Sequence, residues 1–280
     1  ASDLDVVAVY RVREPDDSAT VPAAARYAER IVSELRRLVS DPRFPVDLDF
    51  DLRPEGKNGP IVRSLEAYAS YYERWSLTWE SQALLRARPV GGDVALGEAF
   101  IELADRIRYP AALAEGAVRE IRRMKARVEA ERLPRGVDPR RHLKLGPGGI
   151  SDVEWLVQLL QLRHGGSDPR LRTVSTLEAL QAARESGLID AESTQHLVSA
   201  WTLASEIRSA IKLWSGKAQD SLPVDRGDLE GVARVLGLPA GSTSDLEVRW
   251  LAASRRARMV CEREFFGYAD AQLQYPVISG

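Results

Sequence analysis

The stretch "VDLDFDLR" at residues 46–53 alternates strictly between apolar and charged side chains. In an extended strand successive side chains point to opposite faces, so its three aspartates share one face and its apolar side chains share the other. Neighbouring carboxylates repel one another unless water or a cation screens them. The pattern predicts a strand with one packed face and one acidic face.

An acidic pair opens a second strand-like run. Asp3 and Asp5 stand two residues apart at the start of "SDLDVVAVY" (2–10), so both carboxylates lie on one face of a strand. Two carboxylates on one strand and one on a neighbouring strand can hold a pair of Mg²⁺ ions, which suits phosphoryl or nucleotidyl transfer. Hard oxygen ligands suit Mg²⁺ or Mn²⁺ and do not select zinc. The alternative is a solvated sheet face.

The chain changes character along its length. Residues 1–62 alternate between strand-like runs and one helical run, whereas almost everything after about residue 92 has helical periodicity. We predict an α+β fold, with a small mixed-sheet domain over 1–110 and an all-helical bundle domain over 111–280. The predicted helices are separated by Gly, Pro, Asn and Asp signals and lie at 22–39, 64–75, 77–87, 92–107, 111–132, 151–164, 173–186, 190–216, 227–236 and 244–266.

Composition limits the class of protein. The chain has 280 residues, of which 44% are hydrophobic, and a net charge of −2, so it can form two cores and has no global attraction to nucleic acid or anionic membranes. Its single cysteine, Cys261, excludes an intramolecular disulfide and a cysteine-cluster metal site. No apolar run approaches the ~20 residues of a membrane span and no signal-peptide pattern opens the chain, so the expected location is cytoplasmic.

A glycine-rich turn follows the acidic strand. In "LRPEGKNGP" (52–60) the chain turns through prolines and glycines and exposes Lys57. Beside a strand of carboxylates, Arg53 and Lys57 are well placed to meet phosphates or an acidic partner. The alternative is a tight polar loop without a ligand.

A second glycine-rich stretch, "KLGPGGISDVEW" (144–155), precedes an apolar helix. Its serine and glutamate have the spacing of a capping box, so Ser151 is predicted to cap a helix that begins with the next residue. The positive end of that helix favours an anion, Gly148 and Gly149 would let the backbone approach a phosphate, and Lys144 would add a charge. The alternative is a sharp turn between domains.

Other polar residues indicate structure more than chemistry. The three histidines lie far apart without metal-ligand spacing, which favours surface or helix-packing positions. The basic run "VREIRRMKAR" (118–127) is predicted to be a solvated helix face balanced by nearby glutamates, with docking of an acidic partner as the alternative.

Four motifs occur together in one order: "SDLDVVAVY" (2–10), "VDLDFDLRPEGKNGPIV" (46–62), "YYERWSLTWESQALLRARPVGGD" (71–93) and "KLGPGGISDVEWLVQLLQLRHGG" (144–166). Together they resemble the glutamine synthetase adenylyltransferase family, bifunctional enzymes of the polymerase-beta-type nucleotidyltransferase superfamily. The likeness covers nearly the whole chain. The details "RPEG" and "SDVEW", followed by "LRTVSTLEAL" (171–180), resemble the C-terminal, adenylylating unit of that family.

The resemblance implies that Asp3, Asp5 and Asp49 are catalytic and bind two metal ions, Mg²⁺ or alternatively Mn²⁺. Where the family commonly has an arginine, this chain has Asp51, which is either an additional ligand or a solvated acid. A glycine-serine segment normally precedes the first acid pair in this family, so the N-terminal part of the nucleotidyltransferase domain is expected to be missing from the sequence. The residues expected to bind the nucleotide are Arg53, Lys57, Lys144, Gly148 and Gly149.

The resemblance also implies a reaction. The enzyme would transfer AMP from ATP to a tyrosine hydroxyl of glutamine synthetase and release pyrophosphate, with Asp49 helping to deprotonate the hydroxyl. One alternative is the related deadenylylating unit, which removes AMP by phosphorolysis; another is a non-catalytic helical adaptor that binds nitrogen-signalling regulators. A PII-type signalling protein is an expected partner through the full-length enzyme, whereas nucleic acid and membranes are not.

Overall fold

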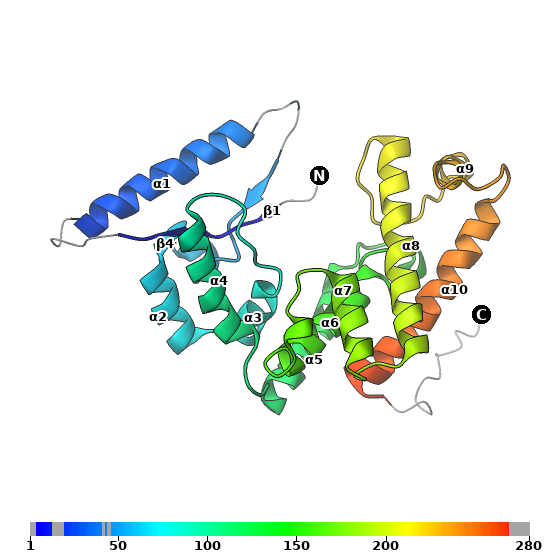
Figure 1. The fold of residues 1–280 in the computed structure, drawn as a ribbon. Coiled ribbons are helices and arrows are strands. Elements are labelled where there is room, and N and C mark those ends of the chain that lie inside the picture. The colour runs from blue at the N-terminus through cyan, green and yellow to red at the C-terminus, as the bar shows by residue number, and fades with distance from the viewer. Residues whose placement is uncertain (1–3, 13–19, 41–42, 44–45, 269–280) are drawn as a thin grey trace. The chain divides into compact units, whose positions relative to one another are not determined.

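The structure, a computed structural model, describes residues 4–12, 20–40, 43 and 46–268. The chain divides into two compact units, Ala1–Pro110 and Ala111–Gly280. The first combines short strands with helices and the second is built from helices (Figure 1). The protein is thus mostly helical with small parallel sheets, as expected of an α+β fold. Among the residues that the structure describes, no helix is both long and apolar enough to cross a membrane.

The strands of the first unit form two parallel pairs, β1 with β3 and β2 with β4. Helices follow the strands at the end of the unit, and α1 lies between the second and third strands in chain order. The elements are β1 (Leu4–Asp5), β2 (Ala8–Tyr10), α1 (Thr20–Val39), β3 (Leu48–Asp49), β4 (Val62–Ser64), α2 (Leu65–Trp75), α3 (Thr78–Leu84) and α4 (Val94–Arg108).

The strands lie between two apolar layers. Val6 and Ala8 belong to a cluster with Val32 of α1, whereas Val7 and Val9 belong to a cluster with aromatic residues of α2 and α4. Figure 1 shows α1 along one side of the strands and α2 and α4 along the other. This alternation is the period of two predicted for residues 4–12, and it fixes which face each strand residue occupies.

The strand predicted over 46–53 is shorter than expected, since β3 ends at Asp49. The chain turns there because the Asp51 N–H donates to Asp49 Oδ1 (2.7 Å) and the Arg53 N–H donates to the Phe50 carbonyl (3.1 Å). Phe50 is buried in the cluster that includes α1, as the apolar face requires. Asp51 has left the strand, so the three aspartates do not form one continuous row.

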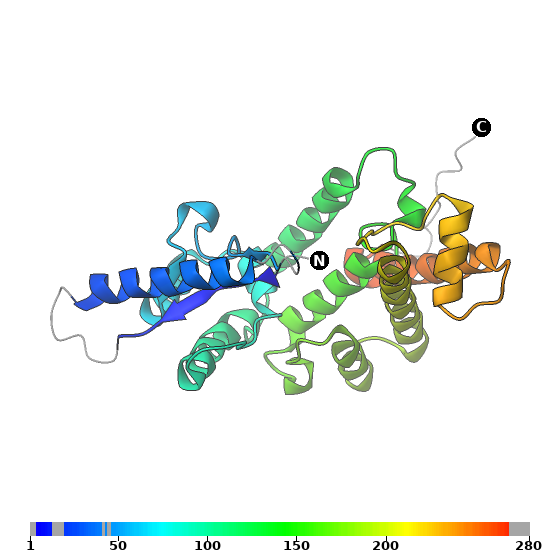
Figure 2. The ribbon, with the colours of Figure 1, turned by 90° about the horizontal axis from the view of Figure 1, so that it is seen from above.

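The second unit is helical throughout its named elements (Figures 1 and 2). Each helical segment predicted from the sequence contains a helix, because long periodic segments and Asp or Ser caps mark these helices clearly. Short turns of 3-10 helix precede α6 and α7, and a π-helical turn over Glu262–Phe266 extends the last helix. The helices are α5 (Glu115–Arg132), α6 (Ile150–His164), α7 (Thr176–Glu185), α8 (Ala191–Ser215), α9 (Arg226–Val235) and α10 (Thr243–Cys261).

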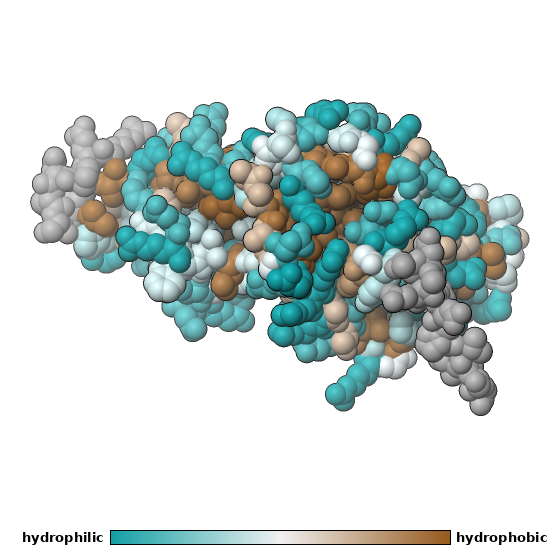
Figure 3. Space-filling model, turned by 90° about the horizontal axis from the view of Figure 1, so that it is seen from below, coloured by the Kyte–Doolittle hydropathy of each residue, from teal (hydrophilic) through white to brown (hydrophobic). Residues whose placement is uncertain are grey.

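The core of the second unit joins α8, α9 and α10 to the loop before α6. Ile207 of α8 and Trp250 of α10 are fully buried in one cluster with Leu143 and Ile150, and the Trp250 indole N–H donates to the Arg140 carbonyl (2.8 Å). Helices α8 and α10 lie side by side (Figures 1 and 2). On the face of this unit seen in Figure 3, hydrophobic residues gather among hydrophilic ones. Because Leu143 and Ile150 flank the glycines of the stretch 144–155 and belong to this cluster, that stretch is part of the packed core.

Candidate functional site

Two of the predicted carboxylates lie on neighbouring strands. In the parallel pairing of β1 with β3, Asp5 stands directly opposite Asp49, and the Val6 N–H donates to the Asp49 carbonyl (2.7 Å). Leu48 and Phe50 pack toward α1, so Asp49 belongs to the opposite face of the sheet. Asp5 is exposed and Asp49 is half-buried. The register therefore brings two acids together at the last residues of β1 and β3.

The donor set at this place suits a hard cation. Carboxylate oxygens are the ligands that Mg²⁺ prefers, and two acids opposite each other in a sheet repel unless a positive charge screens them. Within the described part of the chain, no group of three or more His, Cys, Asp or Glu side chains gathers as a metal site. Asp3, the third predicted ligand, lies outside the described residues. The pair fits a divalent ion and the full triad stays a prediction.

The loop after β3 is held together by Arg53. The residue is 9% exposed, its Nε–H donates to the Gly59 carbonyl (3.0 Å) and its Nη1 donates to the Phe50 carbonyl (2.8 Å). A Cβ on Gly59 would lie 2.3 Å from the Pro54 carbonyl oxygen, so the loop closes only with glycine there. The predicted phosphate ligand Arg53 thus has a structural role in the loop, and its contact with a nucleotide stays a prediction.

The same loop presents a charged pair to solvent. Lys57 Nζ lies 3.3 Å from Asp51 Oδ2, and Arg53 Nη1 lies 3.6 Å from Asp51 Oδ1. Two cations therefore lie beside the Asp51 carboxylate, and its role as an additional ligand or a solvated acid stays open. The Lys57 side chain is 82% exposed, so its ammonium group is accessible to an anionic ligand.

The helix after the second glycine-rich stretch begins earlier than predicted. Helix α6 starts at Ile150 with Gly149 as its N-cap, and no side chain caps it. The prediction that Ser151 caps this helix is wrong: its N–H donates to the Lys144 carbonyl (2.9 Å) and the residue is buried inside the first turn. The Ile150 N–H likewise donates to the Leu143 carbonyl (3.0 Å). Main-chain carbonyls of the loop thus satisfy the first N–H groups of the helix.

The two glycines of this stretch allow close packing within the unit. Gly148 has a φ of +71°, and a Cβ there would lie 1.8 Å from the Ser254 carbonyl oxygen of α10; on Gly149 it would lie 2.6 Å from the Leu143 carbonyl oxygen. The Gly148 N–H donates to Asp152 Oδ2 (2.7 Å). Close packing of the backbone therefore explains why both positions are glycine. The nucleotide contacts of these two glycines stay a prediction.

The stretch contains one predicted ligand with an accessible charge. Lys144 is exposed, and its backbone N–H is oriented by His142, whose buried ring accepts hydrogen bonds at Nδ1 from Lys144 (3.3 Å) and Leu145 (3.0 Å). Burial lowers the pKa of His142, which keeps the ring neutral and able to accept. His142 is thus a structural residue that shapes the loop.

Replacing Gly148 with alanine is expected to destabilise the helical unit by about 2–5 kcal/mol, since the new side chain meets both an unfavourable φ and the backbone of α10. Gly187 is the matched control, with a φ of +68° and open space around its Cβ. Gly187→Ala is expected to cost about 1 kcal/mol. Thermal or urea unfolding measures both variants, and equal losses would show that the contact with Ser254 is unimportant.

A buried ionic cluster adjoins the loop. Asp152 is 2% exposed and Lys125 is 1% exposed, and their Oδ1 and Nζ atoms lie 2.5 Å apart. Arg258 of α10 approaches Asp152 Oδ2 at 3.0 Å, and Glu129 contacts both cations. We call Lys125, Glu129, Asp152 and Arg258 the buried ionic cluster. It fixes α5, α6 and α10 relative to one another.

The buried ionic cluster was not predicted from the sequence. The basic run 118–127 is not only a solvated face, because Lys125 follows Val118 and Ile121 at helical spacing and shares their buried side. This helical spacing is the feature of the sequence from which the burial of Lys125 could have been predicted. Burial alone would raise the pKa of Asp152, but the attraction of Lys125 and Arg258 outweighs burial and the pKa is lowered. Asp152 therefore carries a charge inside the core.

The chain matches known proteins over both units. Residues 1–103 match the family model described as Glutamate-ammonia ligase adenylyltransferase, and residues 119–265 match the model described as GlnD PII-uridylyltransferase. Among curated proteins, the chain resembles the bifunctional glutamine synthetase adenylyltransferase/adenylyl-removing enzymes of Leifsonia xyli subsp. xyli (56% identical over 266 residues), Streptomyces coelicolor (53% over 268) and Mycobacterium avium (47% over 267).

These alignments cover nearly all of this chain and a small part of each relative. They include 95%, 95% and 94% of the chain, but 26% of the length of each of the three relatives. The first family model covers the unit that holds Asp5 and Asp49, and the second covers the unit that holds the buried ionic cluster. The resemblance seen in the four sequence motifs is confirmed, and the chain belongs to the glutamine synthetase adenylyltransferase family.

Proposed function

We propose that this chain catalyses transfer of AMP from ATP to a tyrosine hydroxyl of glutamine synthetase, with release of pyrophosphate. The observation that carries the proposal is the register of β1 and β3, which sets Asp5 opposite Asp49 on the face of the sheet away from α1. An acid pair on neighbouring strands has no packing purpose, because like charges directly opposite each other destabilise a sheet. Membership of the adenylyltransferase family supplies the chemistry that such a pair would serve.

The carboxylates have distinct tasks in this reaction. Asp3, Asp5 and Asp49 would hold two Mg²⁺ ions, which when bound stabilise charge on the attacking and leaving oxygens. Asp49 is half-buried and one of its oxygens accepts the Asp51 N–H, so its orientation is fixed. Its second oxygen is then the natural acceptor for the proton of the tyrosine hydroxyl. ATP is the substrate in this proposal, and glutamine synthetase is the protein acceptor.

Basic residues would orient the triphosphate. Arg53 holds the loop over 50–59 in shape through two backbone carbonyls, and Lys57 on that loop offers an exposed ammonium group. In the helical unit Lys144 offers another exposed ammonium group, while Gly148 and Gly149 keep its loop compact. A charge-assisted contact with phosphate strengthens binding more than a neutral hydrogen bond does. Lys57 and Lys144 are therefore the proposed phosphate ligands.

The direction of the reaction and the wider setting belong to the same proposal. Similarity of "RPEG" and "SDVEW" to the adenylylating unit favours attachment of AMP over its removal. The match of the helical unit to a PII-uridylyltransferase model favours a PII-type signalling protein as a regulator of the natural protein. Since ATP and glutamine synthetase are the substrates, we place the reaction in the cytoplasm.

Two assays on the natural protein that contains this chain separate the possible activities. ATP labelled at the α-phosphate, with Mg²⁺ and glutamine synthetase, is expected to label a tyrosine of the acceptor. Adenylylated glutamine synthetase with inorganic phosphate measures the reverse chemistry as release of ADP. Both assays are run with Asp5→Asn and Asp49→Asn variants to assign the activity to this chain. Loss of ADP release alone in these variants would assign the deadenylylating activity to this chain instead, and loss of neither would favour a non-catalytic adaptor.

Lys144→Ala is expected to weaken ATP binding or turnover about tenfold, since one charged contact with phosphate is lost. The melting temperature should stay unchanged, because the Lys144 side chain is exposed. Lys217→Ala is the control, since Lys217 is an exposed lysine of the same unit outside the glycine-rich stretch. Isothermal titration with ATP and the labelling assay measure both variants. Equal ATP affinity in the two would remove Lys144 from the proposed nucleotide ligands.

A further inference from the structure

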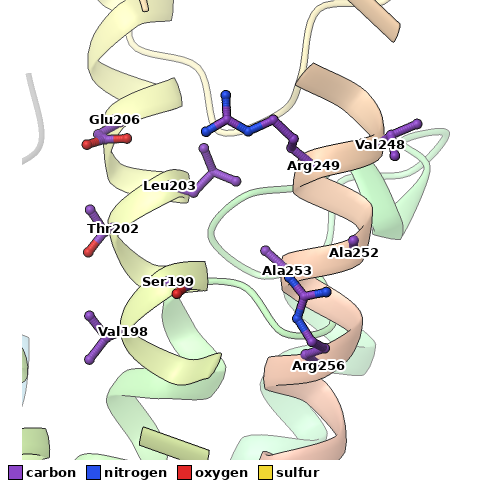
Figure 4. Close-up of a pocket in the computed structure, with 10 residues that line it drawn as sticks. All are labelled: Val198, Ser199, Thr202, Leu203, Glu206, Val248, Arg249, Ala252, Ala253 and Arg256. Carbon is purple, nitrogen blue, oxygen red and sulfur yellow. The ribbon is translucent and has the colours of Figure 1, made fainter. Parts of the chain in front are cut away.

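A groove of about 560 Å³ runs between α8 and α10 in the helical unit. Its volume lies in the range of ligand-binding clefts. Figure 4 shows it as an open channel flanked by two helices. Its lining residues come from both helices and are Val198, Ser199, Thr202, Leu203 and Glu206 of α8 and Val248, Arg249, Ala252, Ala253 and Arg256 of α10.

Two arginines give the groove its charge. Both Arg249 and Arg256 are exposed, and neither makes an ion pair or hydrogen bond with any residue that the structure describes. Figure 4 shows Arg249 extending from α10 toward α8 and Arg256 running along α10 toward Ala253, whereas Glu206 points away from both. Arg258 on the same helix differs, since Asp152, Glu129 and Glu262 surround its guanidinium group. The groove therefore presents two positive charges with no internal partner.

The spacing of these charges indicates the shape of a ligand. Residues 249 and 256 are two helical turns apart, so their Cα atoms are separated by about 10.5 Å along the axis of α10. Between them Ala252 and Ala253 have small side chains that leave room for close approach, and Val248 adds an apolar side chain that is 64% exposed. An occupant must be elongated, apolar on one side and negatively charged at two points.

We propose that the groove between α8 and α10 binds an acidic amphipathic helix of a protein partner. Two Asp or Glu side chains, two turns apart on that helix, would pair with Arg249 and Arg256, and apolar side chains between them would lie over Ala252 and Leu203. A helix placed in an apolar groove and held in register by charged pairs is a recurring mode of peptide recognition. This inference is independent of the proposed transfer reaction, because no groove residue belongs to the acidic strands.

The test uses a random peptide library displayed on yeast and selected on the intact protein. Selected peptides are then synthesised, and their dissociation constants are measured by fluorescence anisotropy against three proteins: the unchanged chain, the double variant Arg249→Glu, Arg256→Glu, and the control Arg255→Glu. Arg255 lies on the same helix, is exposed and does not line the groove. Its replacement by glutamate changes the charge as much as each single replacement in the double variant does. Inorganic triphosphate is titrated in parallel as a small anion without an apolar side.

The proposal expects enrichment of peptides with paired acids at helical spacing. Their affinity should fall at least about tenfold in the double variant and change little in Arg255→Glu. Peptides whose acids are changed to lysine should bind the double variant more tightly than the unchanged chain. The proposal is overturned if selection yields no peptides with paired acids, or if their binding is equally sensitive to Arg255→Glu. It is also overturned if triphosphate binds through Arg249 and Arg256 without displacing the peptides, since the peptides would then bind outside the groove.

Discussion

Asp49→Asn is expected to reduce AMP transfer about a thousandfold, which corresponds to roughly 4 kcal/mol of lost transition-state stabilisation. The change removes one negative charge from the acid pair but keeps an oxygen that can accept the Asp51 N–H, so the turn after β3 survives. Because the repulsion with Asp5 is removed, the melting temperature of Asp49→Asn measured without Mg²⁺ should equal or slightly exceed that of the unchanged protein. Labelled-ATP transfer to glutamine synthetase and thermal unfolding measure the two effects.

A metal titration gives a second measurement that does not depend on activity. Mg²⁺ should raise the melting temperature of the unchanged protein, because a ligand that binds only the folded state stabilises it. This increase should be lost in Asp49→Asn and kept in Glu98→Gln, which removes an exposed carboxylate from α4 of the same unit. Near-normal transfer by Asp49→Asn, or an equal loss in Glu98→Gln, would contradict the proposed role of the acid pair.

Asp152→Asn is expected to destabilise the helical unit by about 3–5 kcal/mol, because Lys125 and Arg258 would be left without their shared buried carboxylate. Asp220→Asn is the matched control: Asp220 pairs with Arg208 at 2.6 Å, but both side chains are about one-third exposed. Exposed pairs contribute little, so the control should lose less than about 1 kcal/mol. Urea unfolding measures both, and similar losses would show that burial does not strengthen the first pair.

The Asp152 contribution should also depend on pH. The pKa of Asp152 in the folded protein lies below its ordinary value because its attraction to Lys125 and Arg258 exceeds the penalty of burial. Its contribution is therefore fully present above the unfolded pKa of about 3.9, and is lost as pH falls through the lower folded value. The stability difference between the unchanged protein and Asp152→Asn should shrink on acidification below that point. A difference independent of pH would assign the effect to packing instead of charge.

Local patterns were sufficient for most elements and for the face of the strand on which each acid lies. Helix α8 was predicted because a long apolar period ends at a glycine, and it is found at Ala191–Ser215 with Gly216 in the left-handed conformation after it. Asp5 and Asp49 could be assigned to one face each from the strand period alone. Their placement opposite each other depends on the register of β1 and β3, which the sequence does not encode locally.

The error at Ser151 arose where the backbone of a loop competes with a local motif. Ser151 has the spacing of a cap, yet the Lys144 carbonyl accepts its N–H and the helix begins before it. At Arg53 the structure adds a role that the sequence did not predict, since two carbonyls of its own loop accept hydrogen bonds from its guanidinium group; its contact with a nucleotide stays a prediction. Neither outcome follows from residue type or spacing, because both depend on how a loop closes on itself.

The separation of Asp152 and Arg258 along the chain has a consequence for synthesis on the ribosome. The two residues are 106 positions apart, so at typical rates of translation Arg258 is added roughly 5–20 seconds after Asp152. In that interval the nascent unit has Lys125 and Asp152 but lacks α10, whose Trp250 fills the core and whose backbone covers Gly148. The growing chain therefore exposes apolar surface to chaperones and proteases until α10 leaves the exit tunnel, and the unit completes its folding only after α10 emerges.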